Sequence, residues 1–127
     1  MTDEHPMMAG SATVFVVSDI AASLAYCRDV LGFEVTFEYG APLSHACLCR
    51  DVVALHLLAA ARTKRLPGQG GLCIFVRDVD QLYAELSGRG ARPINQPEDR
   101  DYGMRDFDIV DADGNQLTFG MGIPEPG

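Results

Sequence analysis

Cysteine and histidine side chains in three apolar stretches are the residues of this sequence best suited to metal chemistry. Cys47 and Cys49 lie two residues apart, and His56 and Cys73 lie in the two stretches that follow. Thiolate and imidazole groups bind transition metals, so a cluster of these four side chains is a conceivable metal site. No Cys-x-x-Cys spacing supports it, and free cysteine usually packs as a small hydrophobic residue. We therefore expect the thiols to be structural.

A pair of carboxylates forms the second chemical feature. In the alternating segment 105–110, Phe107 and Ile109 belong to the core, which turns Asp106 and Asp108 to the opposite face. Two carboxylates at this spacing repel each other unless a cation or a hydrogen-bond donor lies between them. We therefore expect an acidic wall that receives a cationic group. The same alternation in residues 53–58 turns His56 away from the core.

These side chains must be positioned by a unit that occurs twice. Residues 13–19 read TVFVVSD, and residues 72–78 read LCIFVRD. Each copy runs from an apolar strand into an aspartate that caps an amphipathic helix, the first over about residues 20–31. Further strands are predicted at 33–39, 46–50, 52–58, 92–95, 105–110 and 115–120, with a tight turn at Asp111–Asn115. One such unit cannot bury its sheet alone, so the two copies must pair.

The strand predicted at 33–39 leaves two alternatives open. Read straight through, either Phe33, Val35, Phe37 and Tyr39 or the acidic side chains of Glu34 and Glu38 face the space between the modules. The aromatic set is the better candidate for packing contacts, unless sheet curvature changes the orientation.

Composition and charge limit the class of protein. The chain has 127 residues, of which 47% are hydrophobic, so we expect a single domain over residues 1–127 with a substantial core. Its net charge of −8 argues against a nucleic-acid partner and is compatible with a cationic ligand. No apolar run is long enough to span a membrane, and the opening MTDEHPMM differs from a signal peptide. We expect a cytoplasmic protein with reduced cysteines.

Four segments of the sequence resemble the vicinal-oxygen-chelate superfamily, also called the glyoxalase/bleomycin-resistance/dioxygenase superfamily. They are VSDIAASLAYCRDVLGFEV (17–35), RDVVALHLL (50–58), VRDVDQLYAELSGRGARP (76–93) and YGMRDFDIVDADGNQLTFG (102–120). The last segment is similar to the bleomycin-resistance-like branch. The resemblance implies an α+β fold of two paired βαβββ modules, about 12–58 and 71–120, joined by a linker at 59–70. These modules would form a curved mixed sheet around a cavity, with helices on the outer face, in a protein that commonly forms homodimers.

The resemblance also indicates where metal ligands would lie. Enzymes of the superfamily carry ligands on the first and last strands of each module, which correspond here to Ala12, His56, Gly71 and Thr118. Only His56 offers a strong ligand atom, whereas about three protein ligands are needed. We therefore expect neither a metal nor another cofactor.

The resulting hypothesis is metal-independent binding and sequestration of a small hydrophobic or cationic drug-like molecule, as in antibiotic resistance by a binding protein. The partners would be this small molecule and a second copy of the chain. The predicted ligand-binding residues are Phe37, Cys49, His56, Cys73, Phe75, Tyr102, Met104, Asp106 and Asp108. The alternative is a superfamily lyase, isomerase or dioxygenase with an irregular metal site, or with His56 as its general base. The sequence favours the non-enzymatic hypothesis.

Overall fold

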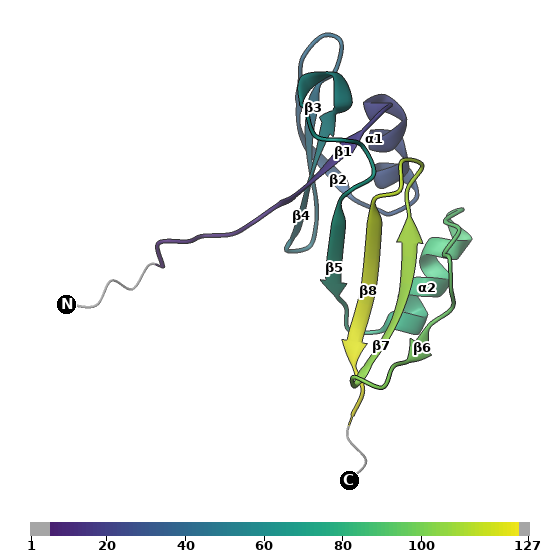
Figure 1. Cartoon of the computed structure of the whole chain (residues 1–127). Coiled ribbons are helices and arrows are strands. Elements are labelled where there is room, and N and C mark those ends of the chain that lie inside the picture. Colours follow the sequence, from purple (N-terminus) through teal and green to yellow (C-terminus); the bar gives the residue numbers. More distant parts are fainter. Residues whose placement is uncertain (1–5, 125–127) are drawn as a thin grey trace, which may run out of the picture.

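The protein, analysed as a computed structural model, is described here over residues 6–124 (Figure 1). Within these residues, two helices and eight strands follow one another in two similar halves, and a short 3₁₀ helix ends the first half. The first half contains β1 (Thr13–Val17), α1 (Ile20–Asp29), β2 (Glu34–Tyr39), β3 (His45–Arg50), β4 (Val53–Ala59) and the 3₁₀ helix (Ala60–Arg62). The second half contains β5 (Gly71–Phe75), α2 (Val79–Gly88), β6 (Glu98–Asp99), β7 (Met104–Val110) and β8 (Gln116–Gly122).

Each half forms its own four-stranded mixed sheet. The first sheet has the order β1-β4-β3-β2, and the second has the equivalent order β5-β8-β7-β6. In both, the first strand pairs in parallel with the last, and the remaining pairs are antiparallel. The predicted α+β class and the two βαβββ modules are therefore confirmed. The strands form two separate sheets, however, and not one continuous curved sheet.

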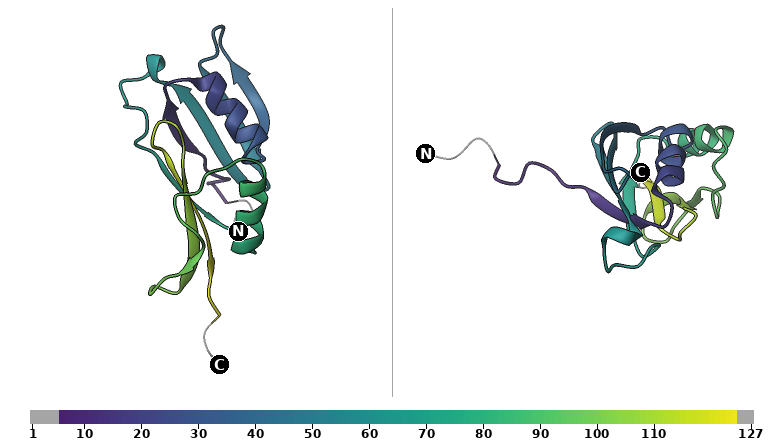
Figure 2. Two further views of the ribbon diagram at one scale, coloured as in Figure 1. Left: turned by 90° about the vertical axis from the view of Figure 1, so that its right-hand side faces the viewer. Right: turned by 90° about the horizontal axis from the view of Figure 1, so that it is seen from above.

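The helices cover one face of each sheet and leave the other face open. Both helices lie on the same side of the molecule, and the two sheets lie end to end (Figures 1 and 2). The side chain of Asp19 accepts a hydrogen bond from the Ala22 N–H at 3.0 Å, and Asp78 accepts one from the Gln81 N–H at 3.0 Å. These contacts confirm both predicted helix caps. Helix α1 ends two residues earlier than predicted.

The core lies between the helices and the covered faces of the sheets. Its fully buried side chains include Phe15, Val17, Leu31, Leu48, Leu55, Leu57, Val79, Leu86, Phe107, Ile109 and Leu117. The predicted alternation therefore holds in β4 and β7, where the apolar set faces the helices. Every other residue of these strands consequently faces the open side.

The short strand of the second half lies later in the chain than predicted. We predicted it near 92–95, but β6 is Glu98–Asp99, which begins three residues after that range ends. Pro93 has no N–H to donate to a ladder. Asn95 is held instead through its side chain, which donates to Asp108 at 2.7 Å and accepts from the Asp108 N–H at 2.7 Å.

The predicted turn at Asp111–Asn115 joins the two halves. One carboxylate oxygen of Asp111 accepts three backbone N–H groups of this turn at 2.8–2.9 Å. The fully buried Asn115 donates to the Val16 carbonyl at 3.0 Å and accepts from the Gly70 N–H at 2.9 Å. The hydrogen bond to Val16 therefore links the turn of the second module to β1 of the first.

The chain before β1 runs away from both sheets (Figures 1 and 2). Residues 6–12 are exposed, including Met7 and Met8. From the sequence we expect residues 1–11 to form an N-terminal arm, of which residues 1–5 lie outside the described residues. That this arm crosses to a partner chain stays a prediction.

Candidate functional site

The open face of the first sheet is built from alternate residues of β3 and β4. His45, Cys47 and Cys49 lie on this face of β3, whereas Ala46 and Leu48 point to the core. His56 lies on the same face of β4, directly opposite Cys47 in the antiparallel register. The predicted orientation of His56 therefore agrees with the structure.

A β-bulge in β2 decides which side chains of that strand reach the open face. The register with β3 shifts between Val35 and Phe37, so two residues of β2 oppose one residue of β3. Phe37 pairs with Cys47, and Tyr39 pairs with His45, which places both rings on the open face. Val35 instead faces the helix side.

Neither orientation predicted for this strand is therefore correct along its whole length. Before the bulge, Glu34 pairs with Cys49 on the open face, while Phe33 is buried in the core. After the bulge, the aromatic rings replace the carboxylates on that face, because the extra residue reverses the alternation.

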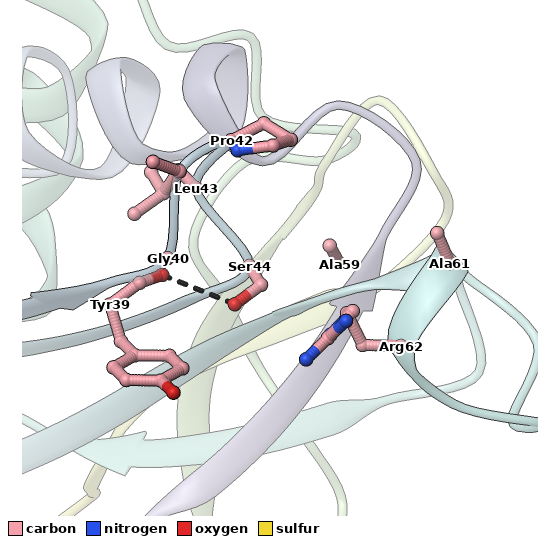
Figure 3. Close-up of a pocket in the computed structure, with 9 residues that line it drawn as sticks. Tyr39, Gly40, Pro42, Leu43, Ser44, Ala59, Ala61 and Arg62 are labelled. Atoms are coloured by element: carbon pink, nitrogen blue, oxygen red, sulfur yellow. Dashed lines mark hydrogen bonds between the residues drawn. The ribbon is translucent and has the colours of Figure 1, made fainter.

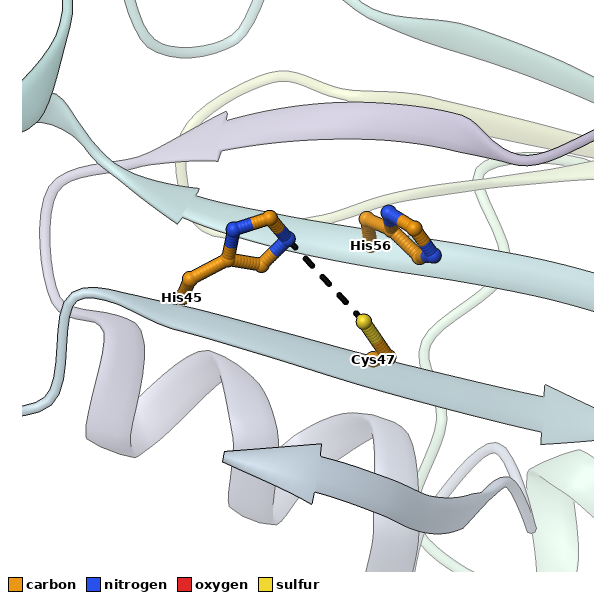
Figure 4. A group of neighbouring side chains, drawn as sticks. All are labelled: His45, Cys47 and His56. Carbon is orange, nitrogen blue, oxygen red and sulfur yellow. Dashed lines mark hydrogen bonds between the residues drawn. The ribbon is translucent and has the colours of Figure 1, made fainter. Parts of the chain in front are cut away.

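His45, Cys47 and His56 form a close group on this face (Figure 4). One ligand atom from each side chain lies within 4.8 Å of the other two, and all three side chains are half-buried. The Nε2 atom of His45 is 4.0 Å from the Sγ atom of Cys47. The two imidazole rings meet edge to face, with centroids 5.4 Å apart.

This group differs from the thiol cluster that we considered from the sequence. Cys73 lies on β5 of the other sheet, and His45 takes the place that we assigned to further cysteines. His45 was missed because the predicted strand began at residue 46, one position after it. With the correct boundary, its two-residue spacing from Cys47 would have placed both on one face.

The open face of the second sheet carries the remaining predicted residues. Cys73 and Phe75 are exposed on β5, and Phe75 pairs with Gly120 in the parallel register. Asp106 and Asp108 lie on the same face of β7, as predicted, and Met104 is half-buried there. Tyr102 precedes the strand and its ring is mostly exposed.

Asp106 is paired within its own module. It accepts hydrogen bonds from Arg100 Nε at 2.8 Å and from the Tyr102 hydroxyl at 2.7 Å, and its side chain is only 8% exposed. Burial acts to raise the pKa of this carboxyl. The hydrogen bonds from Tyr102 and Arg100, and the charge of Arg100, outweigh burial and lower that pKa.

Asp108 is also fully engaged by neighbouring side chains. It accepts from Asn95 at 2.7 Å, from Gln116 at 3.1 Å and from the Thr118 hydroxyl at 2.6 Å. The expectation of two repelling carboxylates that await a cation is therefore wrong. Donors from the loops and from β8 already satisfy both groups, and sequence alternation contains no information on those donors.

Two open hollows lie beside these faces. The first, with a volume of about 290 Å³, is lined by Tyr39, Gly40, Ala41, Pro42, Leu43, Ser44, Ala59, Ala61 and Arg62 (Figure 3). The Ser44 hydroxyl in its wall donates to the Tyr39 carbonyl at 3.2 Å. The second, about 530 Å³, is lined by Gly68, Gln69, Gly70, Gly71, Leu72, Cys73, Gly114, Gln116 and Thr118.

The predicted ligand-binding residues consequently fall into two groups on two sheets. Phe37, Cys49 and His56 belong to the first sheet, and the other six lie on β5, on β7 or, for Tyr102, just before β7. Within one chain, the sheets lie end to end, so these groups do not face each other across one cavity (Figure 1).

The remaining positions expected for superfamily metal ligands offer no free ligand group. Ala12 lies before β1 and is exposed, and Gly71 has no side chain to offer. The Thr118 hydroxyl donates to Asp108. In these described residues, only His56 offers a strong ligand at the expected positions.

The arrangement of two βαβββ modules with an open face defines a known class of protein. The family profile of the Glyoxalase/Bleomycin resistance protein/Dioxygenase superfamily matches residues 11–119. The chain therefore belongs to this superfamily. A search of curated proteins gave no significant match.

Solved structures agree with this assignment at the level of the fold. The glyoxalase/bleomycin resistance protein from Catenulispora acidiphila is 25% identical, with a TM-score of 0.75 over 92% of this chain and 100% of that chain. The bleomycin-binding protein from Streptomyces verticillus, complexed with copper(II)-bleomycin, is 24% identical, with a TM-score of 0.74 over 95% and 100%. Lactoylglutathione lyase from Agrobacterium tumefaciens is 21% identical, with a TM-score of 0.74 over 92% and 95%.

These neighbours include a binding protein and an enzyme, so similarity of fold does not distinguish the two classes. None of the helices in residues 6–124 has the length and apolar character needed to cross a membrane.

Proposed function

We propose that this protein binds a small, largely hydrophobic aromatic molecule and sequesters it without chemical change, in the manner of an antibiotic-resistance binding protein. The observation that carries the proposal is the exposure of aromatic rings on both open faces. Phe37, Tyr39 and Phe75 are 53%, 60% and 76% exposed. Large aromatic side chains on one side of a protein typically mark a binding surface.

The residues of this chain at the superfamily's metal-ligand positions support binding over catalysis. Ala12 and Gly71 offer no metal ligand, and Thr118 is bonded to Asp108. Binding by ring stacking and burial of apolar surface requires none of these positions. We therefore propose that binding is independent of a metal at the superfamily's catalytic positions.

Aromatic rings also determine where a cationic group of the ligand would bind. Asp106 and Asp108 already have their own donors, so these carboxylates are poor partners for an added cation. The faces of Phe37, Tyr39 and Phe75 attract cations through their π electrons. A hydrophobic ligand with a cationic group remains compatible with the site through this contact.

A second copy of the chain completes the proposed binding site. The open faces of one chain lie end to end, whereas a ligand pocket usually encloses most of its ligand. Pairing of two chains would cover the exposed rings and enclose a cavity between faces of different copies. The proposed active form is therefore a homodimer.

The test is a ligand screen on protein treated with a chelator. Aromatic antibiotics, including bleomycin, are screened by thermal shift, and hits are measured by calorimetric titration. Phe37→Ala and Phe75→Ala should each weaken binding about tenfold, because each removes a stacking surface worth roughly 1 kcal/mol or more. The control is Leu66→Ala, which removes an exposed apolar side chain in the connection between the modules.

Mass spectrometry of the hit after incubation distinguishes binding from turnover. Unchanged ligand mass, with affinity retained in chelator, supports the proposal. Chemical conversion of the ligand, or equal affinity of the wild type and both phenylalanine variants, contradicts it.

A further inference from the structure

The geometry points to a transition-metal site formed by His45, Cys47 and His56 on the open face of the first sheet, and we propose that it binds Zn²⁺. The three residues come from two adjacent strands. His45 and Cys47 alternate on β3, and His56 lies opposite Cys47 on β4 (Figure 4). Two imidazoles and a thiolate form a donor set that is well suited to zinc.

The distances between the donors are close to those of an occupied site. Bond lengths of about 2.05 Å to nitrogen and about 2.3 Å to sulfur in a tetrahedron place those two atoms about 3.6 Å apart. The observed separation between His45 Nε2 and Cys47 Sγ is 4.0 Å. The three ligand atoms all lie within 4.8 Å of one another. Small side-chain rotations are therefore sufficient to bring them around one ion.

Packing on the helix side of the sheet fixes the strands that carry these side chains. Leu48, Leu55 and Leu57 alternate with them and are almost completely buried against the helix side. Because the register between β3 and β4 is fixed by this packing, Cys47 and His56 remain opposite each other. The ligand backbones consequently belong to rigid strands, which preserves the site geometry without the ion.

This site differs from the ligand set of the superfamily enzymes. Only His56 occupies a position expected from the resemblance, and the other two ligands come from β3. We expected no metal because only the ligand positions of the superfamily were considered, and His45 is not one of them. The structure thus gives a reason to revise that expectation.

Three protein ligands leave one coordination position for water or another small ligand. The group lies beside the rings of Tyr39 and Phe37, which pair with His45 and Cys47 on the open face. Zinc with three protein ligands and an exchangeable fourth is typical of sites that bind a further molecule. The sequestration proposed above does not require this ion. Because that proposal is tested in chelator and this one with added metal, failure of one is distinguishable from failure of the other.

The test uses tag-free, metal-free protein and Co²⁺ as a spectroscopic substitute for zinc. Titration should give one ion per chain, with thiolate-to-cobalt charge transfer and the visible bands of tetrahedral cobalt. Zinc should then displace the cobalt. His45→Ala, Cys47→Ser and His56→Ala should each lower zinc affinity by about tenfold or more. Cys49→Ser and Cys73→Ser are matched controls and should bind as the wild type does.

A second measurement needs no substitution. Alkylation followed by peptide mass spectrometry should show that Zn²⁺ protects Cys47, because its thiolate becomes a ligand. The exposed Cys73 should stay reactive and serves as the internal control. A lack of thiolate-to-cobalt absorption would overturn the proposal. So would zinc binding unaffected by Cys47→Ser, or equal alkylation of Cys47 with and without zinc.

Discussion

Asp106 shows how local partners change the role of a side chain on the open face. Its carboxylate lies on the face that the alternation of β7 predicts. It already accepts hydrogen bonds from Arg100 and Tyr102, however. Both partners come from the irregular segment before the strand. Sequence periodicity predicts the face of a side chain, but it gives no information on which loop residues fold back onto it.

Replacing this aspartate should destabilise the protein. Asp106→Asn removes a charge that is buried against Arg100, so we expect a loss of about 1–3 kcal/mol in the free energy of unfolding. Urea denaturation of the variant provides the measurement. Asp101→Asn, an exposed neighbour, is the control and should change stability little. Equal stability of the Asp106 variant and the wild type would argue against a structural role for this pair.

The same pair makes stability depend on pH in the acid range. Hydrogen bonds and the Arg100 charge lower the pKa of Asp106 in the folded state below its ordinary value of 3.8. Its contribution is therefore complete above that ordinary value and is lost as the pH falls through the folded-state pKa. Asp106→Asn should show a smaller loss of stability than the wild type over this range. Part of the loss will remain, because Arg50 and Arg105 likewise lower the pKa values of Glu85 and Asp80.

The candidate metal ligands illustrate the limit of prediction at this scale. Alternation in β4 correctly placed His56, because buried Leu55 and Leu57 define the opposite face. His45 was not predicted as a ligand, because the predicted strand began one residue after the true start of β3. Strand ends carry the weakest periodic signal, and a group that depends on an end residue is accordingly hard to predict.

At the scale of elements, the turn between β7 and β8 connects the modules. Asn115 is fully buried and joins this turn to the β1 carbonyl of Val16 and to the N–H of Gly70. The sequence predicted the turn from its aspartate, glycine and asparagine residues. Its contact with the other module was not predictable, because turn chemistry is local.

Asn115→Ala should therefore cost more than an ordinary turn substitution. It removes the acceptor of the Gly70 N–H and the donor to the Val16 carbonyl and to Asp111, which costs about 1–3 kcal/mol. The control is Gln96→Ala, which removes a side-chain amide from an exposed loop position. Thermal unfolding of both variants tests the expectation. Similar melting temperatures for the two would contradict a connecting role for Asn115.

The helices were the easiest elements to predict, and the short edge strand was the hardest. Asp19 and Asp78 cap helices with a buried stripe, so two independent signals agree at each start. β6 has two residues and no apolar pattern. Its position depends on pairing with β7 and on the clamp of Asn95 around Asp108, both of which are tertiary contacts.

At the scale of the whole molecule, repetition predicted two modules but not their relative placement. A few contacts determine that placement. They include Arg50 with Glu85 at 2.9 Å and Asp113 with the Ser18 hydroxyl at 2.6 Å, in addition to Asn115. Because each contact joins residues far apart in the sequence, the repeat pattern does not reveal it.

The uncovered faces lead to a prediction about assembly. We expect a homodimer, so light scattering at micromolar concentration should give about twice the chain mass of 13.7 kDa. Phe75→Asp should shift the protein toward the monomer, because it places a charge on an apolar face. Val52→Asp, at an exposed turn between β3 and β4, should leave the dimer intact. A wild-type mass near that of one chain would contradict the expectation.

The bulge in β2 has an evolutionary consequence. Because Thr36 is the extra residue between Val35 and Phe37, a chain that lacks it would keep Phe37 opposite Cys47 and Tyr39 opposite His45 in a strand without the bulge. The aromatic surface therefore survives the loss of this one codon in related chains. Alignments that penalise a gap here will pair residues from opposite faces.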